Sequence, residues 1–174
     1  MSHPQIPLPA YFFASIIFQK DEKLKEALDL LSQKEWKISK TTDEMDFHHT
    51  EYYYEEMGRP LKRVFVFFEP LAEREKIVEL KHFSYSIERE LSYNEKRHVN
   101  IDPGYLTLEN IVLSTFKNYS HRIYLGRGVF VEITLIYRNK SYEPLPWTYP
   151  DYRSEEIVKI FNQERETYKR RIRK

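Results

Sequence analysis

The sequence predicts an α+β fold that begins with a ferredoxin-like β-α-β-β-α-β arrangement and continues with an added helix, a β-hairpin and a C-terminal helix. Short apolar runs rich in aromatic and β-branched residues alternate with longer segments whose apolar residues recur every three or four positions. A later alternating stretch is interrupted by Gly-Arg-Gly, as in two paired strands. A chain of 174 residues suits one domain. We expect it to span 1–174, with an extended lead over 1–9 and a basic tail over 169–174.

The first segments predict a β-α-β unit. Tyr11–Phe18 (YFFASIIF) is too short for a typical buried helix and is expected to be a central strand. Asp21 is expected to cap a helix with apolar residues at helical spacing, and residues 36–42 then alternate like a strand. Residues 43–60 have no clean period, which predicts a long loop with a short strand or turn.

The next segments complete the predicted arrangement and add a helix. Leu61–Glu69 is the most strand-like run and ends at a proline, so a second central strand is expected. Residues 73–92 carry an apolar stripe at steps of three and four, which predicts a helix. We expect a short strand over 97–101, a turn at Asp102-Pro103-Gly104, and then a helix capped by Thr107.

The C-terminal third predicts a hairpin, an extended segment and a helix. Residues 120–138 form the hairpin around Gly126-Arg127-Gly128, and residues 143–152 are too rich in proline for a helix. Ser154 is expected to cap the last helix. In the predicted register three pairs face each other: Leu125 with Val129, Ile123 with Val131, and Arg122 with Glu132. One face of the hairpin is then expected in the core: Ile123, Leu125, Val129, Val131, Ile133 and Leu135.

The composition excludes several classes of chemistry. The chain has no cysteine, so thiolate catalysis, an iron–sulfur cluster and Cys-ligated zinc are excluded. No run approaches the ~20 apolar residues of a membrane span, and we expect a cytoplasmic protein with no membrane partner. The formal net charge of +1 disfavours nucleic-acid binding except through the basic tail. Abundant Lys and Glu with few glycines resemble thermophile proteins, a statement about stability only.

The Gly126-Arg127-Gly128 segment is not a phosphate-binding loop. A P-loop needs G-x-x-x-x-G-K-[ST] between a strand and a helix, and here a strand follows. The sequence therefore predicts no P-loop nucleotide site, and no cofactor is identified.

The loop over 43–60 holds weak metal-ligand candidates. His48, His49 and Glu51 supply the imidazole and carboxylate groups that suit zinc, manganese or iron. Their spacing matches no strong metal motif, since HHTEYYYEE is not HExxH. The alternative is a solvated polar loop with aromatic packing.

Two further segments carry candidate catalytic residues. Asp102 lies in NIDPGY at a predicted strand end, leading toward a predicted helix start that offers N–H groups to an anion, with Tyr105 as a ligand-binding candidate beside it. His121 and Glu132 on the hairpin are candidates for proton transfer, and Arg122 for anion binding. The alternatives are a turn without function and a simple cross-strand ion pair between Arg122 and Glu132.

The proline-rich segment PLPWTYPDYRSE carries the remaining ligand-binding candidates. Rigid aromatic rings beside an acid and a base can stack on a planar ligand such as a nucleobase and fix it by hydrogen bonds. The alternative is a strap that covers the core. The candidates are Trp147, Tyr149, Asp151 and Arg153.

The strings DFHHTEYYYEEMG, VNIDPGYLTLENIVLSTFKNYSHRIYLGRGVFVEITL and EPLPWTYPDYRSEE together resemble a prokaryotic family known as domain of unknown function 4416. The resemblance covers nearly the whole chain. It implies a stand-alone prokaryotic protein and transfers no catalytic residue.

Three functions of different classes remain open. The first is an enzyme or binding protein for a small anionic, nucleotide-like molecule, which requires NIDPGY, the hairpin and the proline-rich strap to meet in one pocket. The second is a partner-binding or assembly module, including a homo-oligomer, anchored by Tyr52, Tyr53, Tyr54 and Trp147. The third is a nucleic-acid accessory protein acting through Lys169 to Lys174.

Overall fold

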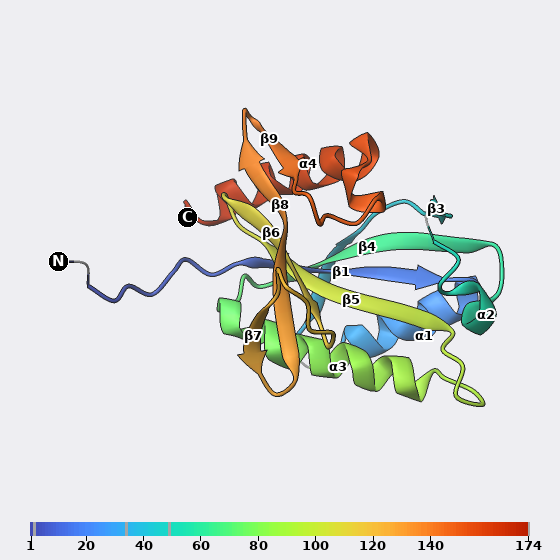
Figure 1. Ribbon diagram of the computed structural model, residues 1–174. Helices are drawn as coiled ribbons and strands as arrows, with labels where there is room; N and C mark the ends of the chain where they lie inside the picture. Colours follow the sequence, from blue (N-terminus) through green and yellow to red (C-terminus); the bar gives the residue numbers. More distant parts are fainter. Residues whose placement is uncertain (2, 34, 49, 174) are drawn as a thin grey trace.

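The computed structural model describes residues 1, 3–33, 35–48 and 50–173 (Figure 1). In these ranges nine strands form one sheet, in which every pairing is antiparallel. The order along the sheet is β2-β4-β1-β5-β6-β8-β7, with β3 beside β4 and β9 beside β8. Helices pack on both faces of the sheet, which confirms the predicted α+β class.

The centre of the sheet agrees with the sequence prediction. β1 (Tyr11–Phe18) lies between β4 (Leu61–Glu69) and β5 (Val99–Leu106), and β2 (Lys37–Thr41) pairs with the other side of β4. Every residue of β1 is buried. A strand covered on both faces has no polar side to alternate, which explains its continuous apolar run.

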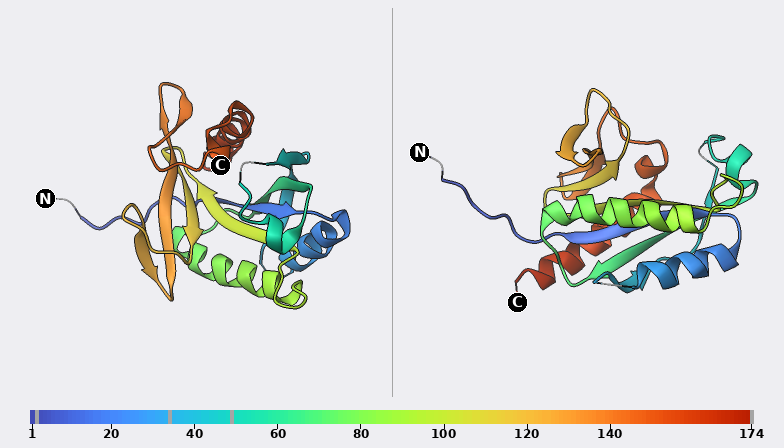
Figure 2. Two further views of the ribbon diagram at one scale, coloured as in Figure 1. Left: turned by 45° about the vertical axis from the view of Figure 1, so that its right-hand side comes forward. Right: turned by 90° about the horizontal axis from the view of Figure 1, so that it is seen from below.

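Two helices cover one face of the sheet. α1 (Asp21–Leu31) and α3 (Ile77–Glu90), which follows the short 3-10 helix η1 (Arg74–Lys76), pack beside each other there (Figures 1 and 2). Lys20, not Asp21, is the N-cap residue of α1, so that prediction is wrong. Asp21 instead lies in the first turn, where a negative charge interacts favourably with the helix dipole. The apolar stripe predicted for α3 is buried as expected: Ile77, Leu80, Ser84, Ile87 and Leu91.

The opposite face is covered by α4 (Glu155–Arg171) (Figure 2). The Ser154 hydroxyl accepts a hydrogen bond from the backbone N–H of Ile157 at 3.3 Å, which confirms the predicted cap. Phe161 packs its ring on Phe13 and Phe65, with centroid distances of 4.8 and 5.2 Å. No helix in the described ranges is long and apolar enough to cross a membrane.

Shorter elements complete the chain. β3 (Met45–Phe47) and α2 (Tyr54–Met57) lie within the predicted loop. β9 (Ser141–Pro144) and the 3-10 helix η2 (Asp151–Arg153) lie at the two ends of the proline-rich segment. The residues between them run over the surface as a strap.

The predicted turn at 102–104 and the predicted helix after Thr107 are both wrong. β5 continues to Leu106, and β6 (Asn110–Thr115) returns beside it. The Thr107 hydroxyl accepts from the backbone N–H groups of Glu109 and Asn110, both at 3.2 Å, so it stabilises a tight turn between strands. The apolar residues after it fit a helical spacing equally well, and only pairing with β5 and with the next strand selects the strand.

The hairpin forms, but its register differs from the prediction. In β7 (Ile123–Gly126) and β8 (Val129–Arg138), Ile123 pairs with Val131 as predicted. Gly126 takes the place predicted for Leu125 opposite Val129, because the strands contain a bulge. A second register shift, opposite β6, skips Thr134 and reverses the faces of β8 beyond it. The predicted core face is therefore only half right: Val129, Val131 and Leu135 are buried, whereas Ile123, Leu125 and Ile133 are exposed.

Candidate functional site

The sheet opens at the middle of β5. β1 pairs with β5 from Val99 to Leu106, whereas β6 pairs only with its last three residues. At Gly104 the two strands approach so closely that an added Cβ would lie 2.4 Å from the carbonyl oxygen of Val112. The preceding residue, Pro103, has no N–H to continue the ladder, and its carbonyl instead accepts from the Ser114 hydroxyl at 2.8 Å. β6 therefore departs, and the first half of β5 is left as an edge.

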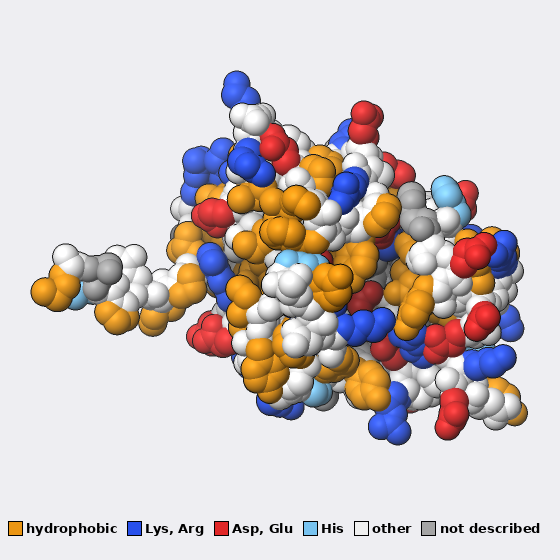
Figure 3. Space-filling view, in the orientation of Figure 1, with side chains coloured by type: hydrophobic (Ala, Val, Ile, Leu, Met, Phe, Trp, Pro, Cys, Tyr) orange, Lys and Arg blue, Asp and Glu red, His pale blue; other side chains and the backbone are white. Residues whose placement is uncertain are grey.

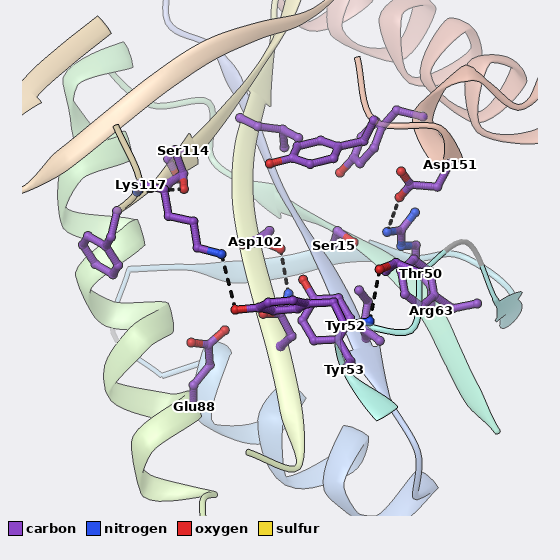
Figure 4. Close-up of a pocket in the computed structure, with 18 of the residues that line it drawn as sticks. Ser15, Thr50, Tyr52, Tyr53, Arg63, Glu88, Asp102, Ser114, Lys117 and Asp151 are labelled. Atoms are coloured by element: carbon purple, nitrogen blue, oxygen red, sulfur yellow. Dashed lines mark hydrogen bonds and ion pairs between the residues drawn. The ribbon is translucent and has the colours of Figure 1, made fainter. Parts of the chain in front are cut away.

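A cavity of about 690 Å³ occupies this opening (Figure 4). That volume lies within the range of about 300–1,000 Å³ typical of small-molecule sites. Side chains from β1, β4 and β5 form its floor, including Ser15, Arg63 and Asp102. The walls come from α3, from the residues that follow β6, from the loop between β3 and α2, and from the strap.

The α3 wall bonds both to the open edge of β5 and to a side chain on that strand. Glu88 Oε1 accepts the backbone N–H of Ile101 at 2.5 Å. Lys81 Nζ donates to Asp102 Oδ1 at 3.1 Å, and Asn100 Nδ2 donates to Asp102 Oδ2 at 2.6 Å. The Glu88 carboxyl thus takes the place of a strand at one backbone group of this edge.

The two carboxyl groups at this end have opposite pKa shifts. Burial raises the pKa of Glu88 to about 7, and the nearby Lys81 only partly offsets that effect. Burial also acts to raise the pKa of Asp102, but the charge of Lys81 and the hydrogen bond from Asn100 outweigh it and leave that pKa below its usual range. Near neutral pH, Glu88 holds a proton for much of the time whereas Asp102 is ionised.

The other end of the cavity is built on two buried ionic groups. Arg63 forms an ion pair with Asp151, and its guanidinium lies 4.6 Å from the ring centroid of Phe47. Glu132 Oε2 interacts with His121 Nε2 at 3.0 Å and accepts from Arg122 Nε at 2.8 Å. Because these groups are buried, removing one partner would leave an uncompensated charge in the protein interior.

Two buried polar atoms of the cavity, Arg63 Nε and Glu132 Oε1, lack a hydrogen-bond partner within the described residues. Leaving such a group unpaired costs about 1–3 kcal/mol, so the presence of both in one cavity indicates a binding site. Ser15 and Tyr152 are close enough for the serine hydroxyl to lower the tyrosine pKa, although burial has the larger, raising effect. Arg63 Nε can only donate, and the Glu132 carboxylate can only accept.

A contact between two loops crosses the mouth of the cavity. Lys117 Nζ donates to the Tyr52 hydroxyl at 3.3 Å and lies 4.7 Å from the centre of its ring. Figure 4 shows this contact above Glu88. Tyr52 is 62% exposed and packs edge-on against Tyr53, so the mouth is lined by aromatic rings on the solvent side.

The structure brings together four of the residues singled out from the sequence: Asp102, Glu132, Tyr149 and Asp151 all line the cavity. The three segments that carry them therefore meet in one place. Arg122 and His121 lie behind Glu132, and the cross-strand ion pair expected between Arg122 and Glu132 is confirmed. Arg122 also donates to the Tyr149 hydroxyl at 2.8 Å.

Three other predicted ligand-binding residues lie elsewhere. Tyr105 faces the α1 and α3 side of the sheet, where its ring centroid lies 5.6 Å from that of Phe12. Trp147 stacks on His121 with centroids 5.2 Å apart, and Arg153 donates to strap carbonyls, including that of Thr148 at 2.8 Å. These contacts hold the strap in place. The helix N-terminus expected beside Asp102 is absent from the described structure, because β6 is a strand.

The metal candidates lie on the surface. His48 is exposed, and Glu51, whose side chain is 86% exposed, pairs with Arg59 at 3.1 Å. His49 lies outside the described residues. Among the residues that are described, no three His, Cys, Asp or Glu side chains are grouped so that they could hold a metal ion.

Sequence reasoning missed Ser15, Arg63, Lys81 and Glu88. Two of them carried a usable signal, since a polar residue inside a central strand is more informative than an apolar one on the surface. Ser15 interrupts YFFASIIF, and Arg63 interrupts the run of β4. Lys81 and Glu88 follow the buried positions Leu80 and Ile87 on α3, a placement that looks like an ordinary charged helix face.

The fold and the cavity define an α+β protein whose antiparallel sheet opens between two strands to form a small-molecule-sized site. The chain belongs to the family described as Domain of unknown function (DUF4416), whose model matches residues 8–168. This match confirms the resemblance noted in the sequence and includes every residue of the cavity. Neither a search of curated proteins nor a search of solved structures found a match.

Proposed function

We propose that this protein binds a small, planar, polar molecule of nucleoside or mononucleotide size in the cavity beside β5. The observation that carries the proposal is the combination of Arg63 Nε and Glu132 Oε1, both buried and unpaired. One offers only a donor and the other only an acceptor. A heterocyclic base, with C=O and N–H groups on its edge, can satisfy both.

The aromatic residues of the cavity support a planar ligand. Phe47, Tyr53 and Tyr149 line it together with polar groups. Aromatic rings contribute a large contact area, and a few polar groups then fix the ligand's orientation.

The charges of the cavity limit how anionic the ligand is. Arg63, Lys81 and Arg97 each pair with an acidic residue, whereas the Lys117 ammonium contacts the hydroxyl and ring of Tyr52. One anionic group, such as a single phosphate, is therefore expected at Lys117. A triphosphate is disfavoured, because Lys117 is the one cationic side chain among the described lining residues that forms no salt bridge with an acidic residue.

Isothermal titration calorimetry with nucleobases, nucleosides, nucleoside monophosphates and triphosphates tests this proposal. We expect a nucleoside or monophosphate to bind with a Kd of about 100 µM or lower, and triphosphates to bind more weakly. The variant Glu132→Gln replaces part of an acceptor-only carboxylate with a donor, and we expect it to weaken binding about tenfold or more.

Glu164→Gln is the matched control, because Glu164 is a buried carboxylate paired with Lys40 at 2.5 Å on α4, outside the cavity. We expect it to leave the Kd unchanged. The proposal fails if no compound of the panel binds, or if Glu132→Gln binds as tightly as the original protein.

A second candidate function is association with another protein, including a second copy of this chain. Strand β7 is an edge of the sheet, and Ile123, Tyr124 and Leu125 on it are 66%, 58% and 44% exposed. Figure 3 shows hydrophobic side chains gathered over this part of the molecule. An exposed apolar edge strand favours pairing with another chain. Light scattering that finds a strict monomer at high concentration, with no change in Ile123→Lys, argues against it.

The other anchors expected for such an interface differ in exposure. Tyr52 and Trp147 are exposed, whereas Tyr53 and Tyr54 are only partly so. Nucleic-acid binding has less support, because Lys169 and Arg171 at the end of α4 lie near Glu166 and Glu69.

We also propose that β1, α1, β2, β4, α3 and β5 form a ferredoxin-like unit to which β6 to β9 and α4 are added. The strand order β2-β4-β1-β5 and the placement of α1 and α3 on one face support this description. A location in the cytoplasm of a prokaryote is proposed with it, supported by the family resemblance and the charge-rich composition.

A further inference from the structure

A lysine and a tyrosine from two different loops meet across the mouth of the cavity. Lys117 lies in the segment that follows β6, and Tyr52 lies in the loop between β3 and α2. The Lys117 ammonium donates to the Tyr52 hydroxyl at 3.3 Å and lies 4.7 Å from the centre of its ring (Figure 4). An inference from this pair rests on the proposed function, because both residues line the same cavity.

Lys117 differs from the other cationic residues that line the cavity. Arg63, Lys81 and Arg97 each form a salt bridge with an acidic residue, whereas Lys117 forms none within the described part of the chain. An ammonium group has three N–H donors, and the partner of Lys117 among the described side chains is the neutral Tyr52 hydroxyl. The lysine therefore keeps an uncompensated positive charge, with further donors, at the cavity mouth.

The backbone of Lys117 is held from both sides. Its N–H donates to the Thr115 hydroxyl at 3.1 Å, and its carbonyl oxygen accepts from Arg122 Nη1 at 3.0 Å. The same guanidinium donates through Nε to Glu132 Oε2 and through Nη2 to the Tyr149 hydroxyl, both at 2.8 Å. Arg122 thus fixes the loop of Lys117 relative to Glu132, whose Oε1 is the buried acceptor without a partner. The group expected to bind a base and the cation at the mouth are held in one framework.

We propose that Lys117 makes the site selective for ligands that carry one phosphate monoester, and that the phosphate replaces the Tyr52 hydroxyl as the partner of this lysine. In that exchange the ammonium group trades a neutral acceptor for an anionic one, so Coulomb attraction adds to the hydrogen bond. Because the backbone of Lys117 is fixed, the exchange needs movement of side chains alone. The ligand class is thereby narrowed from nucleosides and mononucleotides to mononucleotides.

Isothermal titration calorimetry of each ribonucleoside and its monophosphate tests the selectivity. At about pH 7.5 the phosphate is mostly a dianion, since its second pKa is about 6. We expect the monophosphate to bind about tenfold or more tightly than the matching nucleoside. Inorganic phosphate alone is expected to bind at least about tenfold more weakly than the monophosphate, because it has no planar group to reach Arg63 and Glu132.

Lys117→Gln removes the positive charge and keeps a polar side chain. We expect the Kd of the monophosphate to rise about tenfold, whereas that of the nucleoside changes by no more than about twofold. Lys159→Gln is the matched control, because Lys159 is exposed on α4 and lies outside the cavity lining, and it should leave both Kd values unchanged. Equal losses for both ligands in Lys117→Gln overturn the selectivity and indicate a structural role.

Tyr52→Phe tests the exchange itself, since it removes the hydroxyl and keeps the ring. If the phosphate replaces the hydroxyl, the variant loses a contact in the free protein alone, so the monophosphate should bind about two- to fivefold more tightly. A nucleoside leaves the contact in place, and its Kd should not change. Tyr93→Phe, at an exposed tyrosine outside the cavity lining, is the control. Unchanged or weaker binding of the monophosphate to Tyr52→Phe overturns the exchange.

The outcomes separate this inference from the proposed function. Equal Kd values for nucleosides and monophosphates in the original protein overturn the selectivity and leave the binding function standing. Inorganic phosphate that binds as tightly as a monophosphate overturns the inference, since the planar part of the ligand then contributes nothing. If no nucleoside and no monophosphate binds, both proposals fall.

Discussion

The two halves of β5 differ in what lies along their second edge. Gly104 to Leu106 pair with β1 on one side and β6 on the other, whereas the half before Gly104 pairs only with β1. Along that open half the backbone N–H of Ile101 bonds to the Glu88 carboxyl. A side chain from a neighbouring helix can thus satisfy a backbone group at the point where a sheet opens, as the Glu88 carboxyl does for Ile101.

The side chains of the two halves follow the same division. In the closed half the cavity-side neighbours are apolar, as at Leu106 and Leu113. In the open half they are Asn100 and Asp102, which bond to each other and to charged residues. An open edge needs polar partners, and the polar side chains gathered there also line the cavity.

The largest effect is expected at Gly104, where β5 and β6 approach each other most closely. In Gly104→Val a Cβ would lie 2.4 Å from the Val112 carbonyl and 2.7 Å from the Phe13 ring. We expect the free energy of unfolding to fall by about 4 kcal/mol, because backbone cannot yield as a flexible side chain does. Urea denaturation measures it. Gly128→Ala at the open hairpin tip, where φ is +78°, should cost only about 1 kcal/mol, and an equal loss in both variants would contradict the prediction.

The next effect concerns Glu88, whose carboxyl group accepts a backbone N–H on the open half of β5. The pKa of Glu88 is about 7 in the folded protein and near 4.3 in an unfolded chain, so folding favours its protonated form. This contribution is fully present below about pH 4 and is lost as the pH rises through 7, by about 3–4 kcal/mol in total. Glu88→Gln lacks it and should gain stability relative to the original protein between pH 5 and pH 8, by that order of magnitude.

Denaturant titrations of both proteins at several pH values measure this difference. Glu90→Gln is the control and should follow the original protein at every pH. Parallel stability curves for Glu88→Gln and the original protein would show that Glu88 is ionised in the folded state throughout this range.

The smallest effect is expected for the hydrogen bond between the Ser114 hydroxyl and the Pro103 carbonyl. Ser114→Ala removes the donor to the Pro103 carbonyl and leaves a buried acceptor unpaired. We expect a loss of about 1–2 kcal/mol in thermal or urea unfolding. Ser32→Ala, which removes a hydroxyl bond at an exposed helix end, should cost less than about 0.5 kcal/mol. Similar losses in the two variants would show that water replaces Ser114.

Part of the fold was predictable because local pattern and final burial coincide. β1, β4 and the buried stripe of α3 are long runs whose periodicity has one interpretation. The segment from Asp102 to Phe116 was mispredicted, because Pro-Gly usually marks a turn and the apolar spacing after Thr107 also suits a helix. For the site, Asp102 and Glu132 were identified by their chemical type, while Lys81 and Glu88 resembled a solvated helix face.

The sequence by itself determined the α+β class, the central strands and the absence of thiol and P-loop chemistry, because these depend on residue type and on contacts near in the chain. Only the tertiary structure decided that β5 runs through Pro103 and Gly104 and that α3 faces its open edge. Those features depend on contacts between residues far apart in sequence, such as Glu56 with Arg97 and Arg63 with Asp151. The protonation states of Glu88 and Asp102 follow from the same contacts, since burial and neighbouring charge exist only in the folded protein.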